Sequence, residues 1–467
     1  MVYTYDDDGR MSTAANGGQT TTYAYDAAGN AISAILPTGN GYIETRTYDN
    51  AGRMTELKNQ KGATVLSRST YTLDPVGNRS TILTTTGTTT LTYDANDRLT
   101  QACYIAACTG SDNFRRYTYD DVGNRLTEVS AAGTTSYTYD ALDQLVSSSG
   151  VGGNVTYTFN LDGDQTGSGT QTMTYDLAHR LKTLSSGTTT TTYSYAGDGA
   201  RVEASTGTQA SKKTRYVWDP NRSVPELVRE LDGNNALVRE YQYGLDLISM
   251  KAGSSSYYFH HDGLGSVLNV TSSTGVTQWT YDYHPYGVAR TTMKNSNQAP
   301  TNQIQFAGEY LDPTGLYHLR ARQLAPSVGR FTSPDPIRGS LASAATSSYL
   351  YAGDNPINFV DPLGLESLPP QCNYSPLERA GRVLAGGIVS AGGILTAGIG
   401  VVITGVGVGE IVAAGAEEVG SSGLATVVVA MQVQGGIELV TVYGPGTFVL
   451  GGTLTVAGVA IVGSAFC

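Results

Sequence analysis

The chain contains 467 residues, of which 15% are charged, and its formal net charge is -11. This acidic balance argues against nucleic-acid binding, which depends on clustered Lys and Arg. Glycine (57 residues) and tyrosine (31) far exceed phenylalanine (8) and tryptophan (2). Tyrosine favours strands and glycine favours the turns between them, so the composition predicts a mainly β fold.

A repeated pattern sets the order of the predicted elements from the N-terminus onward. It consists of two aromatic residues separated by one residue, then Asp, then Gly with Arg or Asn; Tyr117–Asp120 followed by Gly123 and Asn124 is one copy. Copies recur mostly about every 20 to 26 residues, a period typical of solenoids and arrays. The turn aspartates of the clearest copies are Asp6, Asp26, Asp49, Asp120, Asp140 and Asp176.

Each copy predicts a β-hairpin. Its two tyrosines lie on one face of a strand because side chains alternate with period two. The Asp then ends the strand and binds nearby backbone N–H groups, while Gly supplies the positive φ of the turn. A single hairpin is only marginally stable, so neighbouring copies must pair into one continuous sheet. We therefore interpret the repeated Tyr and Asp as structural.

The cysteines and histidines carry little further signal. Cys103 and Cys108 either bridge a loop in an oxidising environment or remain two unpaired thiols, and the sequence leaves both readings open. The histidines lie in several segments without the H-x-x-x-H spacing of a metal site. We interpret His260, His261, His284 and His318 as packed on strand faces or in a polar shell interior, and we predict no metal and no cofactor.

Longer motifs follow the repeats and carry a family resemblance. They are His260–Val267, Trp279–Gly287, Phe306–Arg322, Gly329–Pro336 and Tyr349–Leu365. Together with the Tyr-Asp (YD) repeats, they resemble Rhs proteins, a polymorphic toxin family related to teneurins and to the C components of insecticidal toxin complexes. The resemblance covers residues 1–365.

The resemblance implies a fold and three domains. Residues 1–300 would form a YD-repeat β-shell curled into a cocoon, and residues 301–365 the Rhs-associated core that plugs one end. Residues 366–467 would be the variable C-terminal segment, which is often a toxin. The chain begins in the middle of a repeat, so we expect it to be the C-terminal part of a longer protein or a shortened relative. Because 365 residues are few for a full cocoon of this family, we expect it to form only the closing half or to need an N-terminal partner.

The resemblance also implies a self-cleavage site. In the family the core cuts the chain after the Leu of Asp-Pro-x-Gly-Leu, which here places the bond between Leu365 and Glu366. The implied mechanism is aspartic: one carboxylate activates water, while a second, protonated carboxyl polarises the carbonyl. Asp335 and Asp361 match the family's two positions, and Arg330 is the expected charge partner of the pair.

A plain structural interpretation competes with this one. Both Asp335 and Asp361 precede proline, and Asp-Pro is ordinary type I turn chemistry. Spacing alone favours turns, and the family motif shifts our interpretation to self-cleavage. Any enzymatic activity is therefore expected to be that of an intramolecular aspartic autoprotease.

The composition changes sharply after Leu365. No charged residue occurs in Val383–Gly409, Val419–Ile437 or Leu439–Cys467. The first stretch exceeds the roughly 20 residues that span a bilayer, and its small residues spaced four apart suit close helix contacts. Three interpretations remain: a helical or membrane-inserting segment that permeabilises membranes, a translocation segment, and a Gly- and Val-rich β-structure. We favour membrane activity.

The sequence thus predicts an Rhs-type shell that encapsulates or presents its own C-terminal toxin-like segment and releases it by self-cleavage, in competition between bacteria or against a host. The alternative is a non-enzymatic cell-surface or adhesion protein that binds glycans or partner proteins. The partners implied by the resemblance are an immunity protein and a secretion-system component. Because no basic and then apolar region follows Met1, we expect secretion or surface display without an N-terminal signal peptide, with the C-terminal segment at a membrane.

Overall fold

The computed structural model describes residues 1–105, 108–110, 113–222, 224–336, 346–365 and 367–368, and the backbone of four later strands. The chain divides into two compact units, Met1–Asn373 and Tyr374–Phe466. The first unit contains both the repeats and the core expected at residues 301–365, hereafter the core segment.

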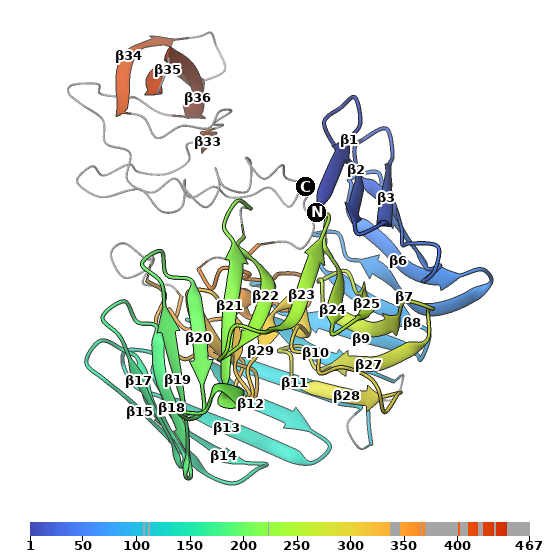
Figure 1. Cartoon of the computed structure of the whole chain (residues 1–467). Coiled ribbons are helices and arrows are strands. Elements are labelled where there is room, and N and C mark those ends of the chain that lie inside the picture. The colour runs from blue at the N-terminus through green and yellow to red at the C-terminus, as the bar shows by residue number, and fades with distance from the viewer. Residues whose placement is uncertain are drawn as a thin grey trace. The chain divides into compact units, whose positions relative to one another are not determined.

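One antiparallel sheet of 28 strands dominates the first unit (Figure 1). Each strand pairs with its neighbours in the sequence, from β1 to β28, so the sheet is a continuous meander. The first fourteen strands are β1 (Val2–Tyr5), β2 (Met11–Asn16), β3 (Gln19–Tyr25), β4 (Ala31–Ile35), β5 (Ile43–Tyr48), β6 (Met54–Lys61), β7 (Thr64–Leu73), β8 (Arg79–Thr84), β9 (Thr88–Tyr93), β10 (Leu99–Cys103), β11 (Phe114–Tyr119), β12 (Arg125–Ser130), β13 (Gly133–Tyr139) and β14 (Leu145–Gly150).

The second half of the meander continues in the same way. Its strands are β15 (Val155–Phe159), β16 (Gln165–Ser168), β17 (Gln171–Tyr175), β18 (Leu181–Ser186), β19 (Thr189–Tyr195), β20 (Arg201–Ser205), β21 (Lys213–Asp219), β22 (Glu226–Asp232), β23 (Leu237–Tyr243), β24 (Leu247–Ala252), β25 (Ser255–His261), β26 (Val267–Ser272), β27 (Thr277–Tyr283) and β28 (Ala289–Lys294). A short 3-10 helix, η1 (Ala210–Lys212), precedes β21. The prediction of a β-hairpin array is confirmed.

The second tyrosine of several copies ties its hairpin to the preceding one. In β13, Tyr139 donates its hydroxyl to the carbonyl oxygen of Arg125 at 2.8 Å. Arg125 pairs with Tyr119 beside a β-bulge, so the hydroxyl satisfies a carbonyl where the ladder is irregular. The same bond recurs along the sheet, in the pairs Tyr25–Met11, Tyr48–Ala31, Tyr93–Arg79, Tyr119–Leu99, Tyr195–Leu181 and Tyr283–Val267.

The aspartate of each copy organises the turn that follows. Asp120 Oδ1 accepts the backbone N–H groups of Val122 at 3.1 Å and Asn124 at 2.7 Å. Its Oδ2 accepts the side-chain amide of Asn124 at 2.9 Å. Backbone N–H groups two and four residues on bind the carboxylate in all six turns named above: Asp6, Asp26, Asp49, Asp120, Asp140 and Asp176.

The sheet curls round the core segment (Figure 1). The largest apolar cluster joins Leu99 and Tyr117 of the sheet to Phe306, Tyr317 and Tyr351 of the core segment. Two further clusters bring Leu316 against β18 and β19, and Val328 against β13 and β14. The core segment contains β29 (Tyr310–Leu311), β30 (Tyr317–Leu319), β31 (Arg322–Ala325) and β32 (Arg330–Phe331), paired in that order, and the 3-10 helices η2 (Phe306–Gly308) and η4 (Ala352–Asp354).

The structure decides between the two states that the sequence left open for the cysteines. Cys103 and Cys108 form a disulfide. In the second unit the structure describes four antiparallel strands, ordered β33-β36-β35-β34: β33 (Gly400–Val401), β34 (Glu410–Glu418), β35 (Leu424–Val433) and β36 (Gly436–Pro445). The rest of the uncharged stretch 383–409 lies outside the described residues. Among the residues that are described, no helix is long and apolar enough to cross a membrane.

Candidate functional site

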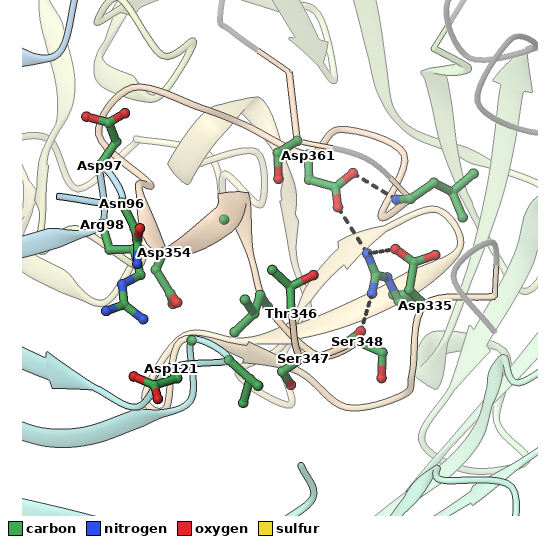
Figure 2. Close-up of a pocket in the computed structure, with 17 residues that line it drawn as sticks. Asn96, Asp97, Arg98, Asp121, Asp335, Thr346, Ser347, Ser348, Asp354 and Asp361 are labelled. Carbon is green, nitrogen blue, oxygen red and sulfur yellow. Dashed lines mark hydrogen bonds and ion pairs between the residues drawn. The ribbon is translucent and has the colours of Figure 1, made fainter. Parts of the chain in front are cut away.

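The structure brings the two predicted aspartates to one guanidinium group. Asp335 and Asp361 are buried, with 5% and 2% of their surface exposed. Nη2 of Arg322 lies 3.4 Å from Oδ2 of Asp335 and 3.2 Å from Oδ2 of Asp361 (Figure 2). The two carboxylates therefore share a single nitrogen of Arg322.

Arg322, rather than the expected Arg330, is the residue that bridges this pair. Its Nη1 donates to the carbonyl oxygen of Ser348 at 3.1 Å, and its guanidinium carbon lies 3.6 Å from the centre of the Phe331 ring. Arg330 points elsewhere and binds the turns of the sheet, through Asn124 Oδ1 at 2.9 Å and the carbonyl oxygen of Asp143 at 2.8 Å. Arg330 thus anchors the core segment to the shell.

The predicted cleavage bond lies at the end of a closed turn. Gly364 donates its N–H to the carbonyl oxygen of Asp361 at 3.1 Å, and Leu365 donates its N–H to Asp361 Oδ1 at 2.8 Å. Val360 and Leu368 pair across the base of the loop with backbone bonds of 2.8 and 2.7 Å. Leu365 therefore sits in a short loop fastened at both ends. Glu366, on the other side of the predicted bond, lies outside the described residues.

Residues 320–322 of the core segment, hereafter the clamp, hold this turn by hydrogen bonds to its carbonyl oxygens. The carbonyl oxygens of Pro362, Leu363 and Gly364 accept hydrogen bonds, in that order, from Arg320 Nη1 at 2.8 Å, the Ala321 N–H at 3.1 Å and Arg322 Nε. Gly364 has a φ of +66°, and a Cβ there would lie 2.6 Å from the carbonyl oxygen of Leu319. Only glycine allows this approach, so the motif glycine is needed for the turn to pack on the clamp.

Both carboxylates open onto an acidic pocket of about 510 Å³ (Figure 2). Leu365 lines the same pocket, together with Asp97, Arg98, Asp121 and Asp354. Asp354 is buried, and its Oδ2 has no hydrogen-bond partner among the described residues. Burial raises the pKa of Asp354 to about 7, although Arg125, Arg330 and Arg98 each act to lower it. The pocket thus holds a carboxyl group that takes up a proton near neutral pH.

A second pocket, of about 750 Å³, lies between the sheet and the core segment. Leu365 lines it as well, with Leu363, Trp218, Pro334 and His318. Because its lining is mostly apolar side chains, it could accept an aliphatic side chain such as that of Leu365.

The histidines singled out in the sequence are buried in the structure. His260 lies between Asn59 Oδ1 and Thr271 Oγ1, at 3.1 and 2.9 Å, and burial lowers its pKa to about 3. Burial also lowers the pKa values of His261 and His318. His284 contacts Tyr104 through Nδ1 and Arg115 through Nε2, at 2.8 Å each. These rings pack within the fold; no group of three metal-binding side chains occurs in the part of the chain that the structure describes.

A continuous hairpin sheet, curled round a segment that carries two bridged carboxylates beside a fastened turn, defines a repeat-built β-shell protein with a core. The chain belongs to the teneurin YD-shell family, whose model matches residues 77–357, and an RHS repeat model matches residues 5–40.

Comparison with individual proteins agrees with this assignment. The chain is 33% identical over 155 residues to the tRNA3(Ser)-specific nuclease WapA of Bacillus spizizenii. This match covers 32% of this chain and 6% of that protein. It is 31% identical over 112 residues to the toxin protein Tse5 of Pseudomonas aeruginosa, covering 23% of this chain and 8% of that protein. The crystal structure of TcdB2-TccC3-TEV matches with a TM-score of 0.63 at 21% identity, over 78% of this chain and 20% of that one, which shows a shared fold. The chain thus spans a small fraction of each relative.

Proposed function

We propose that the core segment hydrolyses the peptide bond between Leu365 and Glu366 and thereby separates residues 366–467 from the shell. The observation that carries the proposal is the convergence of Asp335 and Asp361 on Arg322 Nη2, in a pocket that Leu365 also lines. Buried carboxylate pairs of this kind supply the acid and the base of peptide hydrolysis.

The chemistry assigns one role to each carboxyl group. One carboxylate takes a proton from water as the water oxygen adds to the carbonyl carbon of Leu365. The other, protonated carboxyl gives its proton to the departing nitrogen, so the C–N bond breaks and leaves a carboxylate on Leu365 and an amine on Glu366. Arg322 balances part of the negative charge, and the clamp on Pro362–Gly364 keeps the adjoining carbonyl in place.

In this proposal the chain is a carrier of the polymorphic toxin type that presents its own C-terminal segment for release. Membership of the YD-shell family and the similarity to the toxin Tse5 support delivery outside the producing cell. Presentation is favoured over enclosure because the core segment itself packs against the sheet in its main apolar clusters.

The proposal extends to the released segment and its partners. We infer membrane permeabilisation from its uncharged stretches, with an immunity protein protecting the producing cell and a secretion system exporting the chain. Full-length protein added to dye-loaded anionic vesicles should cause leakage, and Asp361→Asn, which cannot release the segment, should cause much less. Vesicles that stay tight with cleaved wild-type protein would remove the membrane role while leaving self-cleavage intact.

Self-cleavage is tested by expressing the full chain and sequencing the products from their N-termini. We expect a small fragment that begins at Glu366, and intact chain for Asp335→Asn and for Asp361→Asn with an unchanged β circular dichroism spectrum. Asp74→Asn is the matched control. Asp74 also precedes Pro and Gly in a turn, but that turn belongs to the repeat sheet and not to the core segment. A wild-type chain that stays intact after folding would refute the proposal.

A second candidate is a non-enzymatic surface or adhesion protein. The observation that favours it is the likeness of the Asp361 turn to the turn at Asp74, where the carboxylate only binds backbone N–H groups. In that case Asp361 would merely shape a turn, and every variant named above would remain uncut, like the wild type.

A further inference from the structure

Arg320 has an unfavourable backbone conformation within the clamp. It occupies the two-residue turn between β30 and β31, where Leu319 pairs with Arg322, and its φ is +55°. A positive φ is unfavourable for a residue with a Cβ, and such residues persist where surrounding contacts hold them, often at functional sites. The contacts of the Arg320 side chain therefore show what this strained position serves.

The guanidinium group of Arg320 joins three parts of the molecule. Its Nη1 donates to the carbonyl oxygen of Pro362, at 2.8 Å, in the turn of residues 361–365, hereafter the cleavage turn. The same nitrogen donates to Oε2 of Glu309 in the core segment. Its Nε and Nη2 donate to the carbonyl oxygen of Pro225, at 3.3 and 3.2 Å. Because Pro225 directly precedes β22, one side chain contacts the cleavage turn, the core segment and the shell.

Glu309 orients this guanidinium group. The side chain of Glu309 is 6% exposed. Its backbone is fixed by two hydrogen bonds of 2.9 Å, one from its N–H to the carbonyl oxygen of Phe306 and one from the N–H of Gln305 to its own carbonyl oxygen. A fixed carboxylate that pairs with an arginine restricts the rotamers of that long side chain. Arg320 is therefore held in the conformation that reaches both carbonyl oxygens.

We propose that Arg320, oriented by Glu309, makes cleavage of the predicted bond depend on the docking of the shell at Pro225. Pro225 accepts two of the four hydrogen bonds that the structure describes for this guanidinium group. Without them the side chain can turn away from Pro362, and the cleavage turn loses a contact that fixes it beside the two carboxylates. The inference rests on the proposed self-cleavage and adds Glu309 and Arg320 to it as positioning residues.

The main test is the rate of cleavage during cell-free synthesis of the full-length chain, followed as the appearance of the fragment that begins at Glu366. Arg320→Gly removes the guanidinium group but relieves the positive φ, so the turn between β30 and β31 should form as before. We expect cleavage to slow about 10- to 100-fold, because a hydrogen bond from a charged group to the cleavage turn is lost. A variant that is cut as fast as the wild type would overturn the inference.

Two prolines of the same shell connection test the dependence on docking. Pro220 and Pro225 both lie between β21 and β22, and in the described part of the chain only the carbonyl oxygen of Pro225 binds Arg320. Pro225→Gly loosens the backbone at that carbonyl and should slow cleavage about two- to fivefold, whereas Pro220→Gly should leave the rate within about twofold of the wild type. Equal rates for the two variants would show that the shell does not control the cleavage turn.

The charge of Glu309 gives a readout that a loss of stability would not produce. Burial raises the pKa of Glu309 to about 7, although Arg320 acts to lower it. Glu309 is therefore ionised at pH 8 and neutral, like glutamine, at pH 5. The ratio of the wild-type cleavage rate to the Glu309→Gln rate should be larger at pH 8, where only the wild type has the ion pair. The same ratio at both pH values would show that this charge does not orient Arg320.

The other titratable groups around Glu309 leave this comparison intact. Asp361 faces Glu309, and burial raises the pKa values of Tyr243 and Tyr351, which stay neutral from pH 5 to pH 8. Burial also raises the pKa of Glu226, which lies near Arg320, to about 7. Because the wild type and Glu309→Gln both contain these groups, their own effects on the rate divide out of the ratio.

Glu230→Gln is the control for lost stability. Glu230 is buried, pairs with Arg239 at 2.6 Å and lies 3.3 Å from the Tyr310 hydroxyl, so this pair also joins shell and core segment. It should lower the urea midpoint in the uncut Asp335→Asn background but leave cleavage within about threefold of the wild type. Slowing equal to that of Arg320→Gly would mean that the rate follows stability alone, and the inference would fail. An uncut wild-type chain would remove the proposed function, whereas a cut wild type with an equally fast Arg320→Gly would remove this inference alone.

Discussion

Arg201 and Asp312 form a buried ion pair, with 2.6 Å between Nη1 and Oδ2 and side-chain exposures of 0% and 1%. Arg201 belongs to β20 of the sheet and Asp312 to the core segment, so the pair joins the shell to the core. Tyr193, Tyr216 and Tyr310 surround the guanidinium group at 4.7 to 5.3 Å. Among the described residues, Nε and Nη2 of Arg201 and Oδ1 of Asp312 have no hydrogen-bond partner, so each charge depends on the other.

Asp312→Asn should therefore destabilise the fold strongly. It leaves the Arg201 charge buried without a counter-charge, which lowers the free energy of unfolding by about 3–5 kcal/mol. Urea denaturation followed by tyrosine fluorescence measures the change. Glu240→Gln is the control, since its partner Arg229 is 55% exposed and such pairs contribute about 0–1 kcal/mol. Equal losses in both variants would contradict this account of the shell–core contact.

The tyrosine hydroxyls that join neighbouring hairpins should contribute measurably one by one. Tyr139→Phe removes the donor to the Arg125 carbonyl and leaves that acceptor without its partner, so we expect a loss of about 1 kcal/mol. Tyr5→Phe, in the first strand where the side chain is 60% exposed, should change stability little. The same urea denaturation experiment tests both variants. An unchanged midpoint for Tyr139→Phe would show that this hydroxyl does not stabilise the fold.

Two turn glycines with similar backbone angles provide a matched pair. Gly9 and Gly123 have φ values of +76° and +94°, so Ala at either position is strained by about 1–2 kcal/mol. A Cβ on Gly9 meets nothing within 4 Å, whereas on Gly123 it would lie 2.7 Å from Leu350 and 2.8 Å from Asp354. We expect Gly123→Ala to lower the melting temperature clearly more than Gly9→Ala, and also to slow self-cleavage, because Leu350 and Asp354 line the acidic pocket.

Asp354 should make the stability of the fold depend on pH. Its pKa is raised by burial from 3.8 to about 7, so between these values the folded protein keeps a proton that the unfolded chain releases. The free energy of unfolding therefore falls as the pH rises from 3.8 to about 7, and Asp354 causes no further loss above that range. Asp354→Asn stays neutral throughout and should raise the melting temperature more at pH 8 than at pH 5. Asp121→Asn, an exposed residue of the same pocket, should show no such difference.

The hairpin array could be predicted from the sequence because its determinants are local. The turn at Asp120 is specified within four residues, by its carboxylate, Gly123 and Asn124. Asp335 and Asp361 could be named only through the family resemblance, because an Asp-Pro pair by itself predicts an ordinary turn. Whether those carboxylates catalyse cleavage stays a prediction.

The sequence by itself determined the repeat, its turns and the strands between them, because each of these depends on residues a few positions apart. Only the tertiary structure decided which arginine meets the two carboxylates. Arg322 and Arg330 are both buried in the core segment, yet one faces Asp335 and Asp361 and the other faces turns of the sheet. That choice follows from how the core segment packs inside the curled sheet, which brings together groups that lie far apart along the chain.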